Sequence, residues 1–296
     1  MRVAVTPTGP VAGYRVAVTG FGAISCAGVG VEALWTALLK DTAPESKRIA
    51  PFDATHIGGP KELRRFDPFS LYALMAADEA WRQSGLAGPL VDAGSIVTTG
   101  IGGLQTVIEQ FRVLSEKGPD RVSPFMVPMM MPNAATAAVS MRFGLGGPCE
   151  TVTTACAAGT HAIGNAARLV ATGRSTVAVA GGAEAVMVEI AEAGFRNMTA
   201  LSNTEFSRPF DVGRDGFVMG EGAGILIWKS GSTRSVAAPR STPRSWARHR
   251  RPTRTTSPLP TLRATAPFVV WNSRSKTPAC RRVTSRTSTR TAPRHR

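Results

Sequence analysis

The stretch Val152-Thr153-Thr154-Ala155-Cys156-Ala157-Ala158-Gly159-Thr160-His161 decides how this sequence folds. It predicts a strand over Val152–Cys156 that leads directly into a helix over Ala157–Ala171, which Gly173 ends as a C-cap. A thiol at such a turn meets the positive end of the helix dipole and free backbone N–H groups, and both favour thiolate over thiol. Cys156 is therefore a candidate nucleophile. For a lone cysteine, the alternative is a buried structural residue.

The other elements expected in residues 1–230 alternate between short β-branched runs and small-residue helical stretches. This pattern is typical of an α/β protein with buried parallel strands. Further strands are expected at Val16–Thr19, Ile96–Thr99 and Thr176–Ala180, with a glycine-broken strand pair in Phe217–Trp228. Helices are expected at Val31–Leu39, Leu71–Ser84 and Thr136–Phe143, the second with Leu74, Ala77, Ala80 and Trp81 on one face.

The charge of the chain is unevenly distributed. The net charge is +15, but residues 231–296 hold 16 Lys and Arg and no Asp or Glu, which leaves 19 basic and 20 acidic residues in 1–230. No stretch reaches the roughly 20 apolar residues that span a bilayer, and the first residues do not resemble a signal peptide. The cysteines show no C-x-x-C spacing, so neither zinc nor a disulfide scaffold is expected, and a reducing cytoplasm is the expected setting.

Residues 231–296 form a tail rich in Arg, Ser, Thr and Pro that cannot bury enough apolar area to offset its ordering entropy. We predict that it is disordered and encoded out of frame. The peptide V-N-A-H-G-T-S-T-P, written in GC-rich codons and read from the second base, gives the sequence Ser288–Arg296. Two further stretches of the tail allow similar translations. An unbroken reading frame in independently sequenced DNA would contradict this hypothesis.

Several motifs together carry a resemblance to a known family. The stretch around Cys156 closely resembles the nucleophile motif of the elongating β-ketoacyl-[acyl-carrier-protein] synthases, and the match runs almost continuously over 16–229. The other similar motifs are Val18–Gly22, Gly100–Gly103, Gly181–Glu184, Ser207–Asp211, Arg214–Val218 and Gly220–Gly224.

The resemblance implies a thiolase-type fold, in which two related βαβαβ halves form a layered α-β-α-β-α sandwich, here with the N-terminal half only. It implies a 3-oxoacyl-carrier-protein synthase II of fatty acid biosynthesis, without a cofactor or metal. In that reaction Cys156 takes an acyl group from acyl carrier protein, and malonyl-carrier protein loses carbon dioxide and attacks the thioester. The backbone N–H of Cys156 would be one oxyanion-hole donor.

The histidines depart from the family pattern. Two histidines of the family's C-terminal half stabilise the developing charge, but His56, His161, His249 and His295 do not occupy those motifs. A structural role is expected for His161, on the nucleophile helix. We therefore expect the chain as written to be inactive in condensation on its own.

The resemblance also assigns binding roles. Lys61, Arg64, Arg65 and Arg208 resemble the basic residues that dock the acidic carrier protein, although they can also be an ordinary solvated charged face. Ile101 would lie beside the acyl tunnel, with core packing as the alternative. The family further implies a homodimer, with no membrane association and no specific nucleic acid.

Alternatives remain open at this stage. A polyketide ketosynthase subunit would keep the fold and change the pathway. Non-specific nucleic-acid binding by the basic tail would be strongly salt-dependent. A hydrolase that pairs Cys156 with His161 has no visible third group to orient the histidine. Gly20-x-Gly22-x-x-Ser25 lacks the third glycine of a dinucleotide fingerprint.

Overall fold

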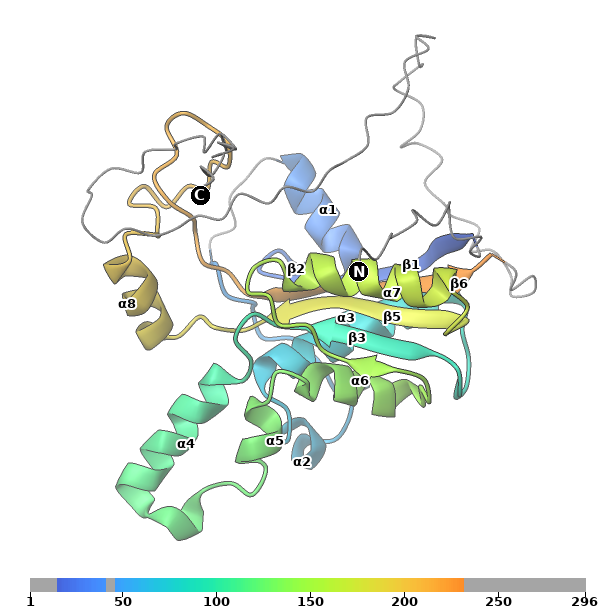
Figure 1. Cartoon of the computed structure of the whole chain (residues 1–296). Helices are drawn as coiled ribbons and strands as arrows, with labels where there is room; N and C mark the ends of the chain where they lie inside the picture. Colours follow the sequence, from blue (N-terminus) through green and yellow to red (C-terminus); the bar gives the residue numbers. More distant parts are fainter. Residues whose placement is uncertain (1–14, 41–45, 232–296) are drawn as a thin grey trace, which may run out of the picture. The chain divides into compact units, whose positions relative to one another are not determined.

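The computed structural model describes residues 15–40 and 46–231, which belong to one unit of the chain, Met1–Thr242 (Figure 1). The predictions of a shifted frame and of nucleic-acid binding fall on the tail, which lies outside the described residues apart from Gly231. The strands are β1 (Val16–Ser25), β2 (Gly28–Val29), β3 (Gly94–Thr98), β4 (Cys149–Glu150), β5 (Val177–Glu184) and β6 (Gly222–Ser230). The helices are α1 (Val31–Lys40), α2 (Pro60–Leu63), α3 (Pro68–Ser84), α4 (Leu104–Lys117), α5 (Met126–Met130), α6 (Ala134–Phe143), α7 (Ala158–Ala171) and α8 (Glu189–Asn197), with a 3-10 turn η1 (Pro119–Arg121).

The strands of the described residues form a six-stranded sheet in the order β2-β1-β6-β5-β3-β4. The pairs β3–β5 and β3–β4 are parallel, as the sequence pattern predicts. The prediction of parallel strands is wrong for the other part of the sheet, because β6 runs antiparallel to both β1 and β5. An apolar run buried on both faces has the same composition in either direction, so the pattern could not distinguish the two.

Helices cover both faces of the sheet, with α7 on one face and α3 and α6 on the other (Figure 1). The side chains of β5 alternate between these two layers, as the pleat of a strand requires. Val177 and Val179 pack in the cluster that contains α3 and α6, whereas Ala178 and Ala180 pack against Ala162 and Ala166 of α7. Both faces of the central strands are therefore buried, and the α/β prediction is confirmed.

Helix α3 confirms the predicted helix, which begins three residues earlier than expected. Asp67 is its N-cap and accepts the N–H of Phe69, and Pro68 occupies the first helical position, where its missing donor is harmless. Gly85 ends the helix with φ 67°. The predicted face is buried, since the exposed fraction of Leu74, Ala77, Ala80 and Trp81 is 9% or less.

Two backbone N–H groups on the outer edge of β1 are bonded by side chains of α3. Strand β2 pairs with β1 only at Ile24 and Ser25. Further along β1, the N–H of Phe21 donates to Gln83 Oε1 at 2.7 Å and the N–H of Ala23 donates to Glu79 Oε2 at 3.0 Å. Side-chain oxygens of the helix thus accept the two N–H groups that would otherwise need carbonyl groups of a longer neighbouring strand.

Two predicted strands are wrong. Residues 152–156 do not form a strand: 152 and 153 are irregular, and the chain turns at Ala155, which adopts a left-handed φ of 50°. The Thr151 hydroxyl donates to the Val97 carbonyl just before this segment. The predicted strand pair of Phe217–Trp228 is the single strand β6, since Phe217 makes only an isolated bridge with Leu201. The helix after Cys156 is confirmed, and Gly173 follows its C-cap Thr172 with φ 74°.

Candidate active site

Cys156 lies in an exposed turn immediately before α7. The turn is closed by two backbone hydrogen bonds, from the Ala157 N–H to the Thr154 carbonyl at 3.2 Å and from the Ala158 N–H to the Ala155 carbonyl at 3.0 Å. Helix α7 begins at Ala158. The thiol therefore lies next to the N-terminal end of a 14-residue helix, where the sequence predicts it, and it is accessible to a substrate.

A pocket of about 570 Å³ adjoins Cys156. It lies where the parallel strands β3 and β5 end and where β6 begins, and ligands commonly bind at the carboxyl ends of parallel strands. Its lining is mainly small or apolar. The lining residues are Thr98, Thr99, Gly100, Ile101, Ala155, Cys156, Ala158, Gly159, Gly182, Ala183, Glu184, Val186, Phe195, Phe217, Met219, Gly220, Gly222, Ala223 and Gly224. Such a cavity fits an alkyl chain attached to the thiol.

Ile101 lines the same pocket, and 44% of its surface is exposed. That exposure does not fit the alternative of core packing within the described residues. The side chain is available to contact a ligand in the cavity, and its predicted role beside an acyl tunnel stays a prediction.

His161 contacts the turn that precedes the helix. Its Nδ1 and the Thr154 hydroxyl are 2.7 Å apart, which ties the first turn of α7 to the residues just before Cys156. This bond fits the structural role expected from the sequence. It also gives no support to the hydrolase alternative, because the ring nitrogen nearer the backbone is engaged by threonine.

The basic residues Lys61, Arg64 and Arg65 are exposed on α2 and just after it. The Arg65 guanidinium lies 4.7 Å from the ring centroid of Phe125, a cation–π contact with the residue before α5. Helix α5 in turn contacts the loop that follows β3, since the Gly103 N–H donates to the Met130 carbonyl at 3.2 Å. The basic residues therefore connect through α5 to the loop that carries Ile101.

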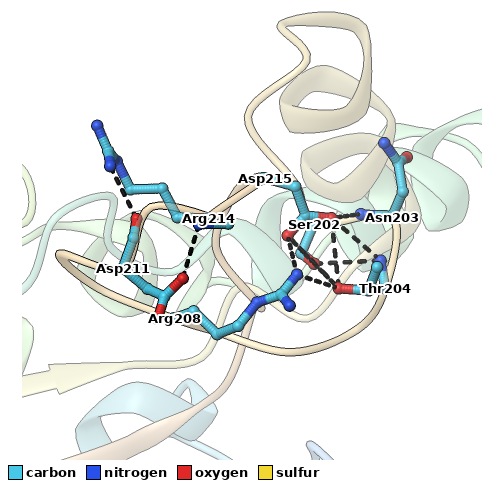
Figure 2. A network of polar contacts seen from close by, with 8 residues as sticks. Ser202, Asn203, Thr204, Arg208, Asp211, Arg214 and Asp215 are labelled. Carbon is cyan, nitrogen blue, oxygen red and sulfur yellow. Dashed lines mark hydrogen bonds and ion pairs between the residues drawn. The ribbon is translucent and has the colours of Figure 1, made fainter.

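Arg208 lies in a different segment, the loop between α8 and β6, within a network around Asp215 (Figure 2). Its guanidinium contacts Asp215 Oδ1 at 3.3 Å and the Thr204 hydroxyl at 3.1 Å. The Ser202 hydroxyl also donates to Asp215, and this bond, with the help of Arg208 and two backbone N–H groups, lowers the pKa of Asp215 to about 2. The structure shows no contact between Arg208 and the α2 group in the described part of the chain.

Glu184 is a pocket residue that the sequence placed in a motif but not in the site. It ends β5, and its carboxylate accepts hydrogen bonds from the Thr99 hydroxyl at 3.0 Å and the Gly100 N–H at 2.9 Å. Burial raises the pKa of Glu184, although these hydrogen bonds oppose that shift. The available signal was a charged residue at the carboxyl end of a buried strand, where ligands commonly bind.

Within residues 15–40 and 46–231, no three or more His, Cys, Asp or Glu side chains cluster in a way that could hold a metal ion. No helix of this described part has the length and apolarity needed to cross a membrane.

Comparison with known sequences identifies close relatives. A sequence model described as the β-ketoacyl synthase N-terminal domain matches residues 40–234. The chain is 38% identical over 247 residues to 3-oxoacyl-[acyl-carrier-protein] synthase 2 of Rhizobium meliloti, which covers 72% of this chain and 58% of that protein. It is 41% identical over 238 residues to the synthase 2 of Staphylococcus aureus, covering 73% and 58%. The chain thus spans a little under three fifths of the length of these relatives.

Solved structures give the same result for the fold. A β-ketoacyl synthase from Burkholderia phymatum superposes with a TM-score of 0.64 at 27% identity, over 74% of this chain and 60% of that one. A ketosynthase bound to a hexaketide, in complex with its acyl-carrier protein, superposes with a TM-score of 0.63 at 26% identity, over 74% and 59%. These matches confirm the expected thiolase-like fold.

Proposed function

The chain belongs to the β-ketoacyl synthase family, and from this premise we propose that Cys156 is the acyl-accepting nucleophile of a 3-oxoacyl-carrier-protein synthase of fatty acid biosynthesis. The observation that carries the proposal is the position of the thiol, exposed before α7 and beside a mainly apolar pocket of about 570 Å³. A nucleophile needs access to its substrate, and a fatty acyl chain needs an apolar cavity.

The first half-reaction transfers the acyl group. The Cys156 thiolate attacks the thioester carbonyl of an acyl-loaded carrier protein and forms a new S–C bond. The C–S bond to the carrier then breaks, and the carrier thiolate leaves and takes up from solvent the proton that Cys156 released. The oxygen of the tetrahedral intermediate would accept a hydrogen bond from the Cys156 N–H. In the second half-reaction, malonyl-carrier protein loses carbon dioxide, and its carbanion attacks the acyl-cysteine to give a β-ketoacyl product and the free thiolate.

The carrier protein is proposed to dock on the exposed basic residues. Lys61, Arg64 and Arg65 offer positive charge on one short segment, and Arg65 contacts Phe125 next to α5, which in turn contacts the loop that carries Ile101. Arg208 adds a further guanidinium, already oriented by Asp215. In support, one similar solved structure is a ketosynthase in complex with its acyl-carrier protein.

A polyketide ketosynthase is the second candidate function, because one of the similar solved structures holds a hexaketide. The curated relatives named 3-oxoacyl-carrier-protein synthase 2 are 38–41% identical, against 26% for that ketosynthase. The higher identity favours fatty acid elongation.

The proposal is tested by acyl transfer to the whole 296-residue chain. The chain is incubated with octanoyl-loaded carrier protein, and the modified cysteine is identified by peptide mass spectrometry. We expect acylation at Cys156, none at the exposed Cys149, and none in the Cys156→Ser variant. Added malonyl-carrier protein should give no β-ketoacyl product, because the family's catalytic histidine motifs have no counterpart in this sequence. A chain that folds but leaves Cys156 unacylated would contradict the proposal.

A further inference from the structure

We propose that Glu184 is a positioning residue that fixes the Thr99–Ile101 wall of the pocket beside Cys156, so that the pocket accepts an alkyl chain. This inference rests on the proposed function of Cys156. It assigns a role to a partly buried carboxylate that the acyl-transfer chemistry itself does not use.

The carboxylate of Glu184 binds three donors around it. Oε1 accepts the Thr99 hydroxyl at 3.0 Å and the Ala185 N–H at 3.3 Å, and Oε2 accepts the Gly100 N–H at 2.9 Å. An ionised carboxylate has only acceptors, so it matches this set of donors better than an amide or a protonated acid. Glu184 thereby connects the end of β5 to the residues that follow β3.

Thr99 extends the connection into the pocket wall. Its side chain is buried, with 2% exposure, and its hydroxyl accepts the N–H groups of Ile101 at 3.4 Å and Gly102 at 3.1 Å while it donates to Glu184. One donor and two acceptor positions are all that a hydroxyl offers, so the group is fully used. The backbone that carries Ile101 is consequently held by Glu184 through one intermediate side chain.

Gly100 also lies close to the turn that precedes the nucleophile. A Cβ placed on Gly100 would lie 3.0 Å from Glu184 Oε2 and 3.6 Å from the carbonyl atoms of Ala155. The glycine therefore fits between the carboxylate and the left-handed turn at Ala155, whose φ is 50°. That turn precedes Cys156 directly, and a non-glycine residue at positive φ needs surrounding structure to hold it.

The test measures chain-length preference at Cys156 in the whole chain, without the need for condensation. Iodoacetamide and N-octyl-iodoacetamide are reacted separately, and rates at Cys156 and Cys149 are obtained by peptide mass spectrometry. Cys149 is exposed and is not a lining residue of the pocket, so it corrects for reagent reactivity. The readout is the octyl-to-short rate ratio at Cys156 divided by the same ratio at Cys149.

We expect Thr99→Val and Glu184→Gln to lower this normalised ratio at least fivefold. Thr99→Ser keeps the hydroxyl and should stay within twofold of the unaltered chain. Glu79→Gln is the matched control, because Glu79 also accepts backbone N–H groups but at Ala23 and Val31, and it does not line the pocket. An unchanged ratio in both test variants, or an equal fall in Glu79→Gln, would overturn the inference.

Hydrogen exchange gives a second readout that does not depend on alkylation. In Glu184→Gln, the amides of Gly100–Gly102 should exchange at least tenfold faster while those of β5 retain their protection. Unchanged exchange at Gly100–Gly102 would overturn the role of Glu184 and leave the proposed function standing. Absence of acyl transfer to the unaltered chain would overturn both.

Discussion

Asp67 and Thr106, 39 residues apart, are joined by a hydrogen bond of 2.7 Å from the threonine hydroxyl to Asp67 Oδ2. The same oxygen accepts the Thr106 N–H at 3.0 Å, and Oδ1 accepts the Phe69 N–H at 3.2 Å. Asp67 is fully buried. One carboxylate therefore caps the first turns of both α3 and α4 and holds the starts of the two helices together.

The Asp67→Ala variant should lose about 2–4 kcal/mol of the free energy of unfolding, because three buried donors lose their acceptor. Urea unfolding followed by circular dichroism measures the loss. Asp53→Ala is the control, since Asp53 is exposed and holds the nearby Thr55 N–H. Equal losses in the two variants would contradict the assigned role.

Gly181 and Gly224 provide a matched pair across the β5–β6 ladder. A Cβ on Gly181 would overlap the Gly224 carbonyl oxygen, whereas a Cβ on Gly224 would meet nothing within 4 Å. Gly181→Ala should therefore destabilise the chain by about 1–3 kcal/mol, and Gly224→Ala should change stability by about 0.5 kcal/mol or less. Thermal and urea unfolding measure both. Similar losses of stability in the two variants would contradict the close approach of Gly181 to the Gly224 carbonyl oxygen.

Asp215 should titrate near pH 2, below the ordinary value of 3.8. Because the folded pKa is lowered, ionised Asp215 stabilises its loop above pH 3.8, and this contribution is lost as the pH falls through about 2. Carbon-detected NMR of the side-chain carboxyl measures the midpoint. Ser202→Ala should raise it more than Arg208→Ala, since the serine hydroxyl is the largest cause of the shift. The reverse order would contradict the network's assignment.

If the carrier protein docks on the basic residues of α2, reversing a charge there should weaken its binding more than reversing a charge elsewhere on the surface. Arg64→Glu should weaken binding of acyl-loaded carrier protein at least fivefold, and the difference should shrink as salt is added. Fluorescence anisotropy with labelled carrier protein measures this in the whole chain. Arg174→Glu makes the same charge change on an exposed residue after α7, at the other end of that helix from Cys156. Equal weakening by both variants would indicate non-specific attraction.

Helices α1, α3, α6 and α7 and the place of the nucleophile could be predicted because their determinants are local, whereas α2, α4, α5 and α8 were not predicted. The apolar face of α3 and the small residues after Cys156 indicate helices in the sequence, whereas the start of α3 at Pro68 was missed by three residues. The strand predicted at Val152–Cys156 failed because β-branched Val and Thr favour extended structure only where a neighbouring strand pairs with them. Here Thr151 is held by Val97 and the chain turns at Ala155.

Contacts between distant segments were not predictable from periodicity. Thr99 and Glu184 are 85 positions apart, and no spacing rule connects them. The antiparallel direction of β6 could not be predicted either, since strand direction depends on the path of the connecting chain. The motifs contain many of the pocket residues but not Thr99, Phe195 or Met219, and only the fold showed which residues lie together.

The α3 side chains along β1 have a consequence for self-association. An exposed edge strand has unpaired N–H and C=O groups, with which a strand of another molecule can pair. Ordered aggregates can grow from such pairing. With Phe21 and Ala23 already bonded to Gln83 and Glu79, an incoming strand would find no free amide at those two positions. Replacing Gln83 and Glu79 by alanine would leave the Phe21 and Ala23 N–H groups free to pair with a strand of another molecule, and aggregation should increase.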